Sequence, residues 1–277
     1  MNSIGIFLKY ARYRYMIYRI LLRIRMGKDK RDEYFRNTGL SILDFLPERP
    51  YVTEYGVKAI IRRGTSDFTV LYMSIEPKVE PHLAMKENEV FVDVGANVGV
   101  YTLMVANNYM DKGVTVVAIE GHPENYKALC RNIECNDESF KHIIKPINKA
   151  VSDHKGIVRM FERTYDGIRA GTSLYSLFDT FVLDGNYVKQ NGCTLKLECD
   201  TLDNILAGRN ADVMNMDIEG AEVLALKGAT NTLKGLRKII VEIHGNNLEA
   251  VKHLLQANGF NTEIICEAMN YVIGTKS

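Results

Sequence analysis

The sequence predicts an α/β fold with a mostly parallel sheet that an antiparallel pair of strands closes. Two observations predict this class. From about residue 86 onward, short apolar runs alternate with stretches of helical periodicity, which is typical of βαβ units. The composition, with 46% hydrophobic and 25% charged residues, excludes a collagen, a coiled coil or a wholly disordered chain. The 277 residues allow one large domain with an extension or two small domains, and we place the large domain at residues 86–277.

Residues 1–45 have the pattern of a basic amphipathic helix. Residues 1–31 carry nine Lys or Arg and one acid, a charge of +8, so the rest of the chain carries −7. Apolar residues recur every three or four positions: Ile4, Phe7, Leu8, Ala11, Tyr15, Tyr18 and Leu22. Either this helix packs on the domain with its basic side in solvent, or residues 1–28 lie on an anionic membrane surface. On such a surface each basic residue contributes about 1 kcal/mol.

The location that we expect is the cytoplasm, with peripheral attachment at the inner membrane face if the helix binds lipid. Basic residues interrupt the apolar run that a signal peptide would need, and no run is long enough to span a bilayer. The five cysteines show no paired spacing, which favours a reducing compartment. The sequence predicts no particular oligomeric state.

Residues 46–85 form a lead-in that we expect to be rich in β-structure. Pro47 and Pro50 end the helical pattern. Short stretches of aromatic and branched residues then follow, interrupted by a turn at residues 63–67. The expected strands are Tyr51–Tyr55, Val57–Ile61 and Thr69–Ile75.

The large domain carries the alternating elements in order. The expected strands are Val90–Val94, Val114–Ile119, His142–Ile147, Ile157–Phe161, Leu195–Cys199, Val213–Met216 and Lys238–Ile243. The expected helices are Val100–Asn108, Pro123–Asn136, Thr201–Ala207, Glu222–Leu236 with a weak point at Gly228, and Asn247–Asn258. Ile264–Cys266 and Tyr271–Ile273 are the closing antiparallel pair, and residues 162–193 are a loop-rich insertion.

The first of these strands ends in the sequence VDVGANVG, residues 92–99. Gly95 permits a tight turn with positive φ, and Gly99 permits close approach of the backbone to a ligand at the helix start. Asp93 is a carboxylate inside an apolar strand, so it needs a donor such as a turn amide or a ligand amine. The glycines are four residues apart with Asn97 between them, so this is neither the GxGxxG fingerprint nor a P-loop.

The next strand ends in Glu120, 21 residues after Gly99. An acid at this place can accept hydrogen bonds from both hydroxyls of a ribose, each worth about 1.5–3 kcal/mol. The alternative is that Glu120 only caps the helix that follows, whose dipole favours an acid there.

Three acids follow the strand Val213–Met216: Asp217, Glu219 and Glu222. One can cap the next helix, and the others can face a cationic or hydroxyl-bearing ligand. His244 follows the next strand, with Glu242 before it, and is a candidate general base because its ordinary pKa of about 6.5 suits proton transfer near neutrality. The alternative is that His244 is structural.

These segments together resemble one family. VFVDVGANVGVYTL, the Glu120 strand end, MDIEGAEVLALKGA and VEIHG are similar to the FkbM family of S-adenosylmethionine-dependent methyltransferases, most strongly over residues 88–245. The sequence departs from the family pattern twice. Glu120 is followed by Gly121 instead of proline, and Asn215 stands where the family usually has lysine.

The resemblance implies a Rossmann-like class I methyltransferase sheet that binds S-adenosylmethionine. Its amino-acid end would lie at the turn of residues 95–99 near Asp93, its ribose on Glu120, and its adenine near residues 148–151, which include Ala150. Its methyl group would point toward Asp217. This chemistry requires no metal, although the acids at residues 217–222 could in principle hold one.

The implied reaction is O-methylation of a sugar or another hydroxyl on a glycan, glycolipid or secondary metabolite. Asp217 or His244 would accept the proton, and Glu219, Thr172 and Ser173 would help to bind the acceptor. One alternative is methylation of RNA or protein, for which the +8 segment could track phosphates, although the −7 remainder and a net charge of +1 give no strong nucleic-acid signal. The other is a methyltransferase-like fold that acts only as an interaction module.

Overall fold

The computed structural model describes residues 47–276, apart from residues 54, 64, 74–76, 163, 166–167, 170–174, 177–179, 184–185, 190–193 and 267–270. The predicted N-terminal helix and two of the predicted acceptor residues, Thr172 and Ser173, lie outside the described residues. Within the described part of the chain, the helices are all too short or too polar to span a bilayer.

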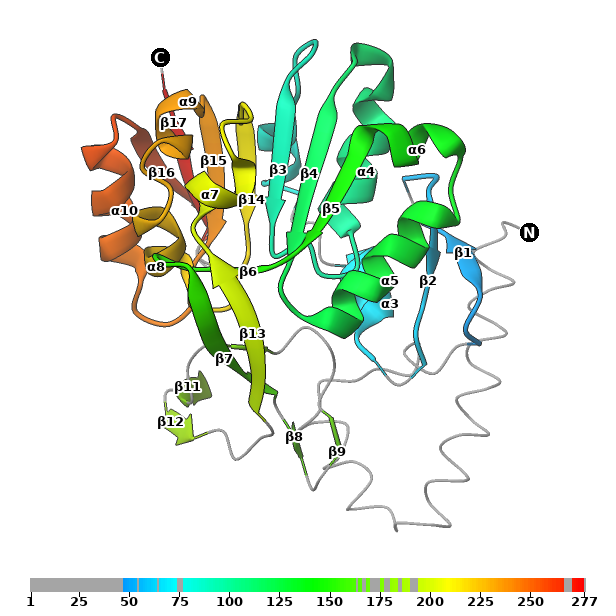
Figure 1. The fold of residues 1–277 in the computed structure, drawn as a ribbon, viewed down its shortest axis with the longest axis horizontal. Coiled ribbons are helices and arrows are strands. Elements are labelled where there is room, and N and C mark those ends of the chain that lie inside the picture. Colours follow the sequence, from blue (N-terminus) through cyan, green and yellow to red (C-terminus); the bar gives the residue numbers. More distant parts are fainter. Residues whose placement is uncertain are drawn as a thin grey trace.

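A seven-stranded sheet forms the centre of the molecule (Figure 1), in the order β16-β17-β15-β14-β3-β4-β5. Five strands are parallel: β3 (Val90–Val94), β4 (Thr115–Glu120), β5 (Ile144–Asn148), β14 (Val213–Met216) and β15 (Lys238–Glu242). β17 (Tyr271–Thr275) runs antiparallel between β15 and β16 (Asn261–Cys266). This confirms the predicted mostly parallel sheet with an antiparallel closing pair. The order of the strands reverses between β3 and β14, which is where ligands bind in open α/β sheets.

Helices cover both faces of the sheet, because successive strand residues point to opposite sides. Phe91 of β3 belongs to one apolar cluster, together with Leu103 and Leu129. Its neighbour Val92 belongs to a second cluster, together with Leu255. The helices that carry these clusters are α4 (Val100–Tyr109), α5 (Pro123–Glu134), α6 (Glu138–Ile143), α7 (Leu202–Leu206), α8 (Glu222–Lys227), α9 (Thr232–Gly235) and α10 (Leu248–Ala257). The helical stretch predicted over Glu222–Leu236 does break at Gly228, which lies between α8 and α9.

The lead-in contains the two strands predicted first, β1 (Pro50–Val52) and β2 (Lys58–Ile60), paired as a hairpin. Side-chain amides of α5 hold β2, since Asn132 and Asn136 accept hydrogen bonds from the backbone of Ile60 and Lys58 at 2.7 and 2.8 Å. The third predicted strand, Thr69–Ile75, is wrong. This segment instead contains helix α3 (Asp67–Met73), which η2 (Glu80–Leu83) follows.

The error has a physical reason. A short apolar run does not distinguish a strand from a buried helix by its pattern. Here the Ser66 carbonyl accepts the Val70 amide, which starts a helical turn, and Phe68 and Leu71 enter the core from it. Arg62 binds the Asp67 carboxylate at 2.8 Å and so holds the first turn of α3 against β2.

The region around the insertion forms a second, smaller sheet in the order β10-β7-β13-β6. Its strands are β6 (Ala150–Val151), β7 (Gly156–Glu162), β10 (Tyr175–Ser176) and β13 (Thr194–Asp200). The predicted loop-rich segment also contains short strands: β8 (Thr164–Tyr165), β9 (Ile168–Arg169), β11 (Thr180–Leu183) and β12 (Asn186–Lys189). β7 and β13 project below the central sheet, on the side to which the arrowheads of β3 and β4 point (Figure 1).

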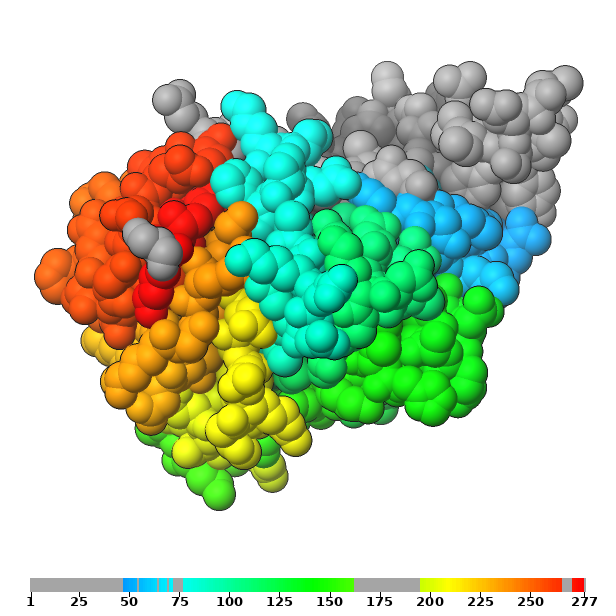
Figure 2. Space-filling model, turned by 90° about the horizontal axis from the view of Figure 1, so that it is seen from above, coloured from blue at the N-terminus to red at the C-terminus, as the bar shows by residue number. Residues whose placement is uncertain are grey.

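An ion pair joins the segment before β3 to the start of β15. The Arg237 guanidinium donates to both carboxylate oxygens of Glu89 at 2.5 and 2.6 Å, and to the Ala84 carbonyl at 2.9 Å. In Figure 2 the cyan segment that leads into β3 lies between the C-terminal elements, in orange and red, and the green helices. Burial alone raises the pKa of Glu89, but hydrogen bonds from Arg237 and Lys86 outweigh it and lower that pKa.

We predict that Arg237→Ala lowers the free energy of unfolding by about 2–3 kcal/mol, because it removes hydrogen bonds to a largely buried carboxylate. Chemical denaturation at neutral pH measures it. The wild-type advantage is lost as the pH falls through the lowered pKa of Glu89, since that carboxylate is then protonated in the folded state as well. Lys252→Ala, at an exposed pair with Glu249, is the control and changes the value by less than about 0.5 kcal/mol. Equal stabilities of the two variants would contradict this role of Arg237.

Candidate active site at the carboxyl edge of the sheet

The turn after β3 is held against the turn after β14. Gly95 has φ +85°, and a β-carbon there would lie 1.8 Å from the carbonyl oxygen of Asp217. From the other direction, the Asp217 amide donates to the Val94 carbonyl at 2.9 Å. Gly99 has φ +99°, and its missing β-carbon makes room for Leu129 of α5. The structure thus explains both glycines by contacts within the protein, while leaving Gly99 at the start of α4 as predicted.

Asp93 is enclosed, with 1% of its surface exposed. The Thr102 hydroxyl donates to its Oδ2 at 2.6 Å, and the Asn215 amide donates to its Oδ1 at 3.2 Å. From the sequence we expected turn amides or a ligand amine as the donors to Asp93. In the structure these two side chains are the donors. Burial raises the pKa of Asp93, and both hydrogen bonds oppose the rise. Asn215, which departs from the family pattern, therefore has a partner on the neighbouring strand.

Glu120 links two loops at the end of β4. Its Oε2 accepts the Asn97 amide at 2.8 Å, and its Oε1 accepts the His122 amide at 2.7 Å. Because His122 is the N-cap of α5, the helix-capping alternative describes one of these bonds. The bond from the Asn97 amide is not explained by helix capping, because it ties Glu120 to the turn after β3. Burial raises the pKa of Glu120 to about 7, against the effect of the two amides. Each carboxylate oxygen still has a second lone pair that can accept a ligand hydroxyl.

Asn97 occupies the left-handed region at φ +51°, and its buried Oδ1 has no hydrogen-bond partner in the described part of the chain. Such an orphaned acceptor costs about 1–3 kcal/mol unless a donor arrives. Nearby, a β-carbon on Gly121 would lie 3.1 Å from the α-carbon of Ala150. The structure therefore brings Ala150 next to the Glu120 loop.

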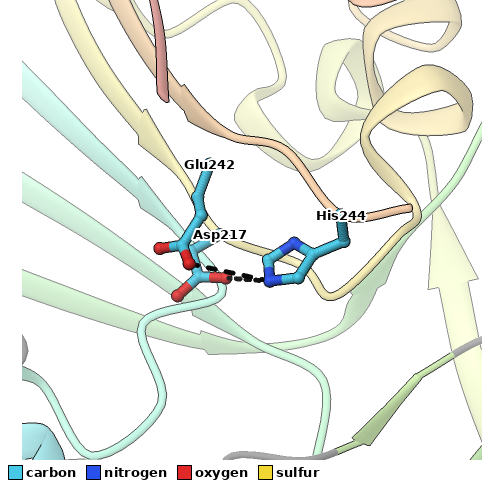
Figure 3. A group of neighbouring side chains, drawn as sticks. All are labelled: Asp217, Glu242 and His244. Atoms are coloured by element: carbon cyan, nitrogen blue, oxygen red, sulfur yellow. Dashed lines mark ion pairs between the residues drawn. The ribbon is translucent and has the colours of Figure 1, made fainter. Parts of the chain in front are cut away.

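Four carboxylates surround one imidazole at the ends of β14 and β15. His244 Nδ1 lies 3.0 Å from Glu222 Oε1, and because a carboxylate only accepts, Nδ1 carries the hydrogen. The other ring nitrogen, Nε2, lies 3.5 Å from Glu219, 3.7 Å from Glu242 and 4.0 Å from Asp217. Figure 3 shows Asp217, Glu242 and His244 pointing toward one another. We call Asp217, Glu219, Glu222, Glu242 and His244 together the acidic cluster.

The charges in the acidic cluster shift its pKa values strongly. Burial alone lowers the pKa of His244, but the carboxylates of Glu222, Glu219 and Asp217 outweigh it and raise that pKa to about 10. Burial raises the pKa of Asp217, and the nearby charges of Glu242 and Glu219 raise it further. In this arrangement His244 holds its proton at neutral pH.

The sequence did not indicate two groups that support the acidic cluster. The Tyr271 hydroxyl, on the antiparallel strand β17, donates to Glu242 Oε2 at 2.7 Å. Asn247 donates to Glu222 Oε2 at 2.7 Å and to the Gly220 carbonyl at 2.9 Å. A faint signal exists for Tyr271 alone, because an antiparallel closing strand places its first residue beside the last residue of its neighbour.

Comparison with known proteins agrees with this geometry. The family model for the methyltransferase FkbM domain matches residues 93–267, more than half of the chain. Hexuronic acid methyltransferase AglP of Haloferax volcanii is 24% identical over 197 residues, which cover 69% of this chain and 72% of that protein. The crystal structure of methyltransferase FkbM from Methylobacillus flagellatus matches with a TM-score of 0.51 and 16% identity, over 75% of this chain and 47% of that one. This chain therefore spans about half the length of that solved protein, and the likeness confirms the predicted Rossmann-like fold.

We predict that Gly95→Ala destabilises the fold more than Gly259→Ala does. The two glycines have nearly equal φ, +85° and +83°, but a β-carbon at Gly259 meets nothing within 4 Å. Gly259→Ala therefore reports the backbone strain alone, about 1–2 kcal/mol. Gly95→Ala adds about 1–3 kcal/mol for the clash with Asp217. Thermal unfolding of both variants measures the difference, and equal losses would mean that the two turns do not constrain each other.

Proposed function

Because the chain belongs to the FkbM methyltransferase family, we propose that it transfers the methyl group of S-adenosylmethionine to a hydroxyl oxygen of its acceptor. One observation carries the assignment of the cofactor. Glu120 at the end of β4 is tied to the glycine turn after β3, and the same turn holds the unpartnered Asn97 Oδ1. A cofactor with ribose hydroxyls and an ammonium group brings donors for both places.

The cofactor residues that we propose are those at the ends of β3, β4 and β5: Asp93, Gly95, Asn97, Gly99, Glu120 and Ala150. Glu120 would accept the ribose hydroxyls, and Asn97 would accept a donor of the amino-acid end. Asp93 acts through the turn, because its side chain is enclosed and binds Thr102 and Asn215. The cofactor, when bound, supplies a methyl group on a positively charged sulfur, and the negative charge of Asp217 across the turn favours that cation.

For the acceptor we propose a sugar or similar hydroxyl. The relative from Haloferax volcanii, which is named for a hexuronic acid, supports a carbohydrate. Glu219, in the acidic cluster, and Thr172 and Ser173, in the insertion, are our candidates for binding it. The carboxylates of the cluster repel phosphates, which disfavours the alternative of an RNA acceptor. We also propose that the protein is cytoplasmic, with residues 1–28 either packed on the domain or in contact with an anionic membrane.

For the reaction we propose in-line displacement, in which alignment is the largest contribution and is worth about 7–11 kcal/mol at most. The hydroxyl oxygen forms a bond to the methyl carbon, the bond from carbon to sulfur breaks with its electron pair going to sulfur, and the hydroxyl proton leaves. Asp217 and His244 are our candidates for assisting the departure of that proton, and such assistance adds about 10²–10⁴-fold. As a base, His244 must first lose the proton that the neighbouring carboxylates hold on it at neutral pH.

We predict that Glu120→Gln weakens the binding of S-adenosylmethionine about 10–150-fold, the equivalent of one charge-assisted hydrogen bond. Isothermal titration calorimetry of the purified chain measures it, and circular dichroism checks that the variant is folded. The matched control is Glu124→Gln, an exposed acid on α5, which leaves the affinity unchanged. An unchanged affinity in folded Glu120→Gln would return Glu120 to a purely structural role.

We predict that His244→Ala lowers kcat about 10²–10⁴-fold while the affinity for S-adenosylmethionine changes little, because His244 serves the acceptor side of the site. The assay follows the mass gain of one methyl on acceptors from a panel of glycans and hydroxylated lipids. His253→Ala, an exposed histidine on α10, is the control. If His244→Ala turned over as fast as that control, His244 would have no part in the chemistry.

A further inference from the structure

We propose that Asp217, Glu242 and His244 bind a divalent cation of the Mg²⁺ or Mn²⁺ class, which also binds an oxygen of the acceptor. The binding of the cation stands on the geometry of these three side chains. Only its contact with the acceptor rests on the proposed function.

The distances suit a cation. One ligand atom from each residue lies within 4.8 Å of the other two. His244 Nε2 is 3.7 Å from Glu242 Oε1 and 4.0 Å from Asp217 Oδ1 (Figure 3). An octahedral cation with ligands at about 2.1 Å holds adjacent ligand atoms about 3.0 Å apart and opposite ones about 4.2 Å apart. The two separations from His244 Nε2 lie between these values, so small side-chain movements complete the site.

Hydrogen bonds already orient two of the three ligands. Glu222 accepts from His244 Nδ1 at 3.0 Å, which leaves Nε2 to face the other carboxylates. The proton that Nε2 holds at neutral pH leaves to water when the cation takes its place. Tyr271 donates to Glu242 Oε2 at 2.7 Å, which leaves Oε1 to face His244. Partners of this kind, bound to the far side of a metal ligand, fix its orientation and raise its basicity. Glu222 is itself fully buried and held by Asn247, so the arrangement is rigid.

The third ligand atom is Asp217 Oδ1. Among the described residues this buried oxygen has no hydrogen-bond partner, and its contact with His244 Nε2 is long, at 4.0 Å. Within the described ranges of the chain, the ion pairs of Asp217 and Glu242 are to His244, not to a lysine or arginine. Asp217 and Glu242 therefore share a single imidazole, and a divalent cation on these three atoms balances their charge while giving Asp217 Oδ1 a partner.

The donor set indicates which cations fit. Carboxylate oxygens suit Mg²⁺, Ca²⁺ and Mn²⁺, whereas imidazole suits later transition metals, so Mn²⁺ is served by both kinds of ligand. Three protein ligands leave coordination positions open for water and for the acceptor. A bound cation lowers the pKa of a hydroxyl on it and orients its oxygen. The proton then leaves to water, the oxygen takes the methyl carbon, and the electron pair of the broken bond stays on sulfur. Asp217 and His244 would thus act on the hydroxyl through the cation.

The test is a titration of the full chain, first treated with EDTA, with Mn²⁺ alone, followed by the electron paramagnetic resonance signal of free Mn²⁺. We expect one Mn²⁺ to bind per chain, and Asp217→Asn and Glu242→Gln to weaken binding at least tenfold each. Glu242→Gln retains an acceptor for Tyr271, and circular dichroism shows that each variant is folded. Glu249→Gln, an exposed acid on α10, is the matched control and binds as the wild type does.

The proposal is overturned if the wild type binds no Mn²⁺, or if folded Asp217→Asn and Glu242→Gln bind it as tightly as Glu249→Gln does. Neither result touches methyl transfer, because the titration contains no cofactor and no acceptor. Conversely, a chain that binds Mn²⁺ at these residues but gives no heat with S-adenosylmethionine would support the cation site and count against the proposed function alone.

Discussion

The turn after β3 and the turn after β14 lie in direct contact, and the arrangement of the carboxyl edge of the sheet depends on this contact. The Gly95 turn lies against the carbonyl of Asp217 with no space for a β-carbon, and the Asp217 amide is bound to the end of β3. The two turns are therefore fixed relative to each other through the main chain. The groups assigned to the cofactor and the acidic cluster take their relative positions from the backbone, which loses little entropy when a ligand binds.

The two halves of this edge have opposite electrostatic tasks. On the side of β3 and β4, buried carboxylates are satisfied by protein donors: Asp93 by Thr102 and Asn215, and Glu120 by two amides. On the side of β14 and β15, the carboxylates of Asp217, Glu219 and Glu242 all face one nitrogen of His244. A positively charged sulfur between the halves would stabilise the second, and so would the proposed cation. An enzyme that must bring a neutral hydroxyl to a cationic methyl donor gains from such a field, because charge develops on the oxygen as its proton leaves.

Much of this edge could be predicted from the sequence, because the carboxyl ends of parallel strands meet on one side of a sheet. Glu120, Asp217 and His244 each follow or end an apolar run, Asp93 interrupts one, and these positions indicated them. The contact of Tyr271 with Glu242 depends on the register of β17 against β15, and the contact of Asn215 with Asp93 joins residues 122 positions apart. No local pattern encodes either pairing. The helix at Asp67–Met73 was missed for a different reason. Its seven residues are too few to display the periodicity of a helix in the sequence.

The most direct measurement of the central claim is a crystal structure of the chain with S-adenosylhomocysteine. The account predicts density along the edge of the sheet, with the ribose on Glu120, the amino-acid end at the turn of residues 95–99, and the sulfur directed toward Asp217. Density elsewhere, or an edge that stays closed around Glu120 in crystals grown with saturating ligand, would contradict it.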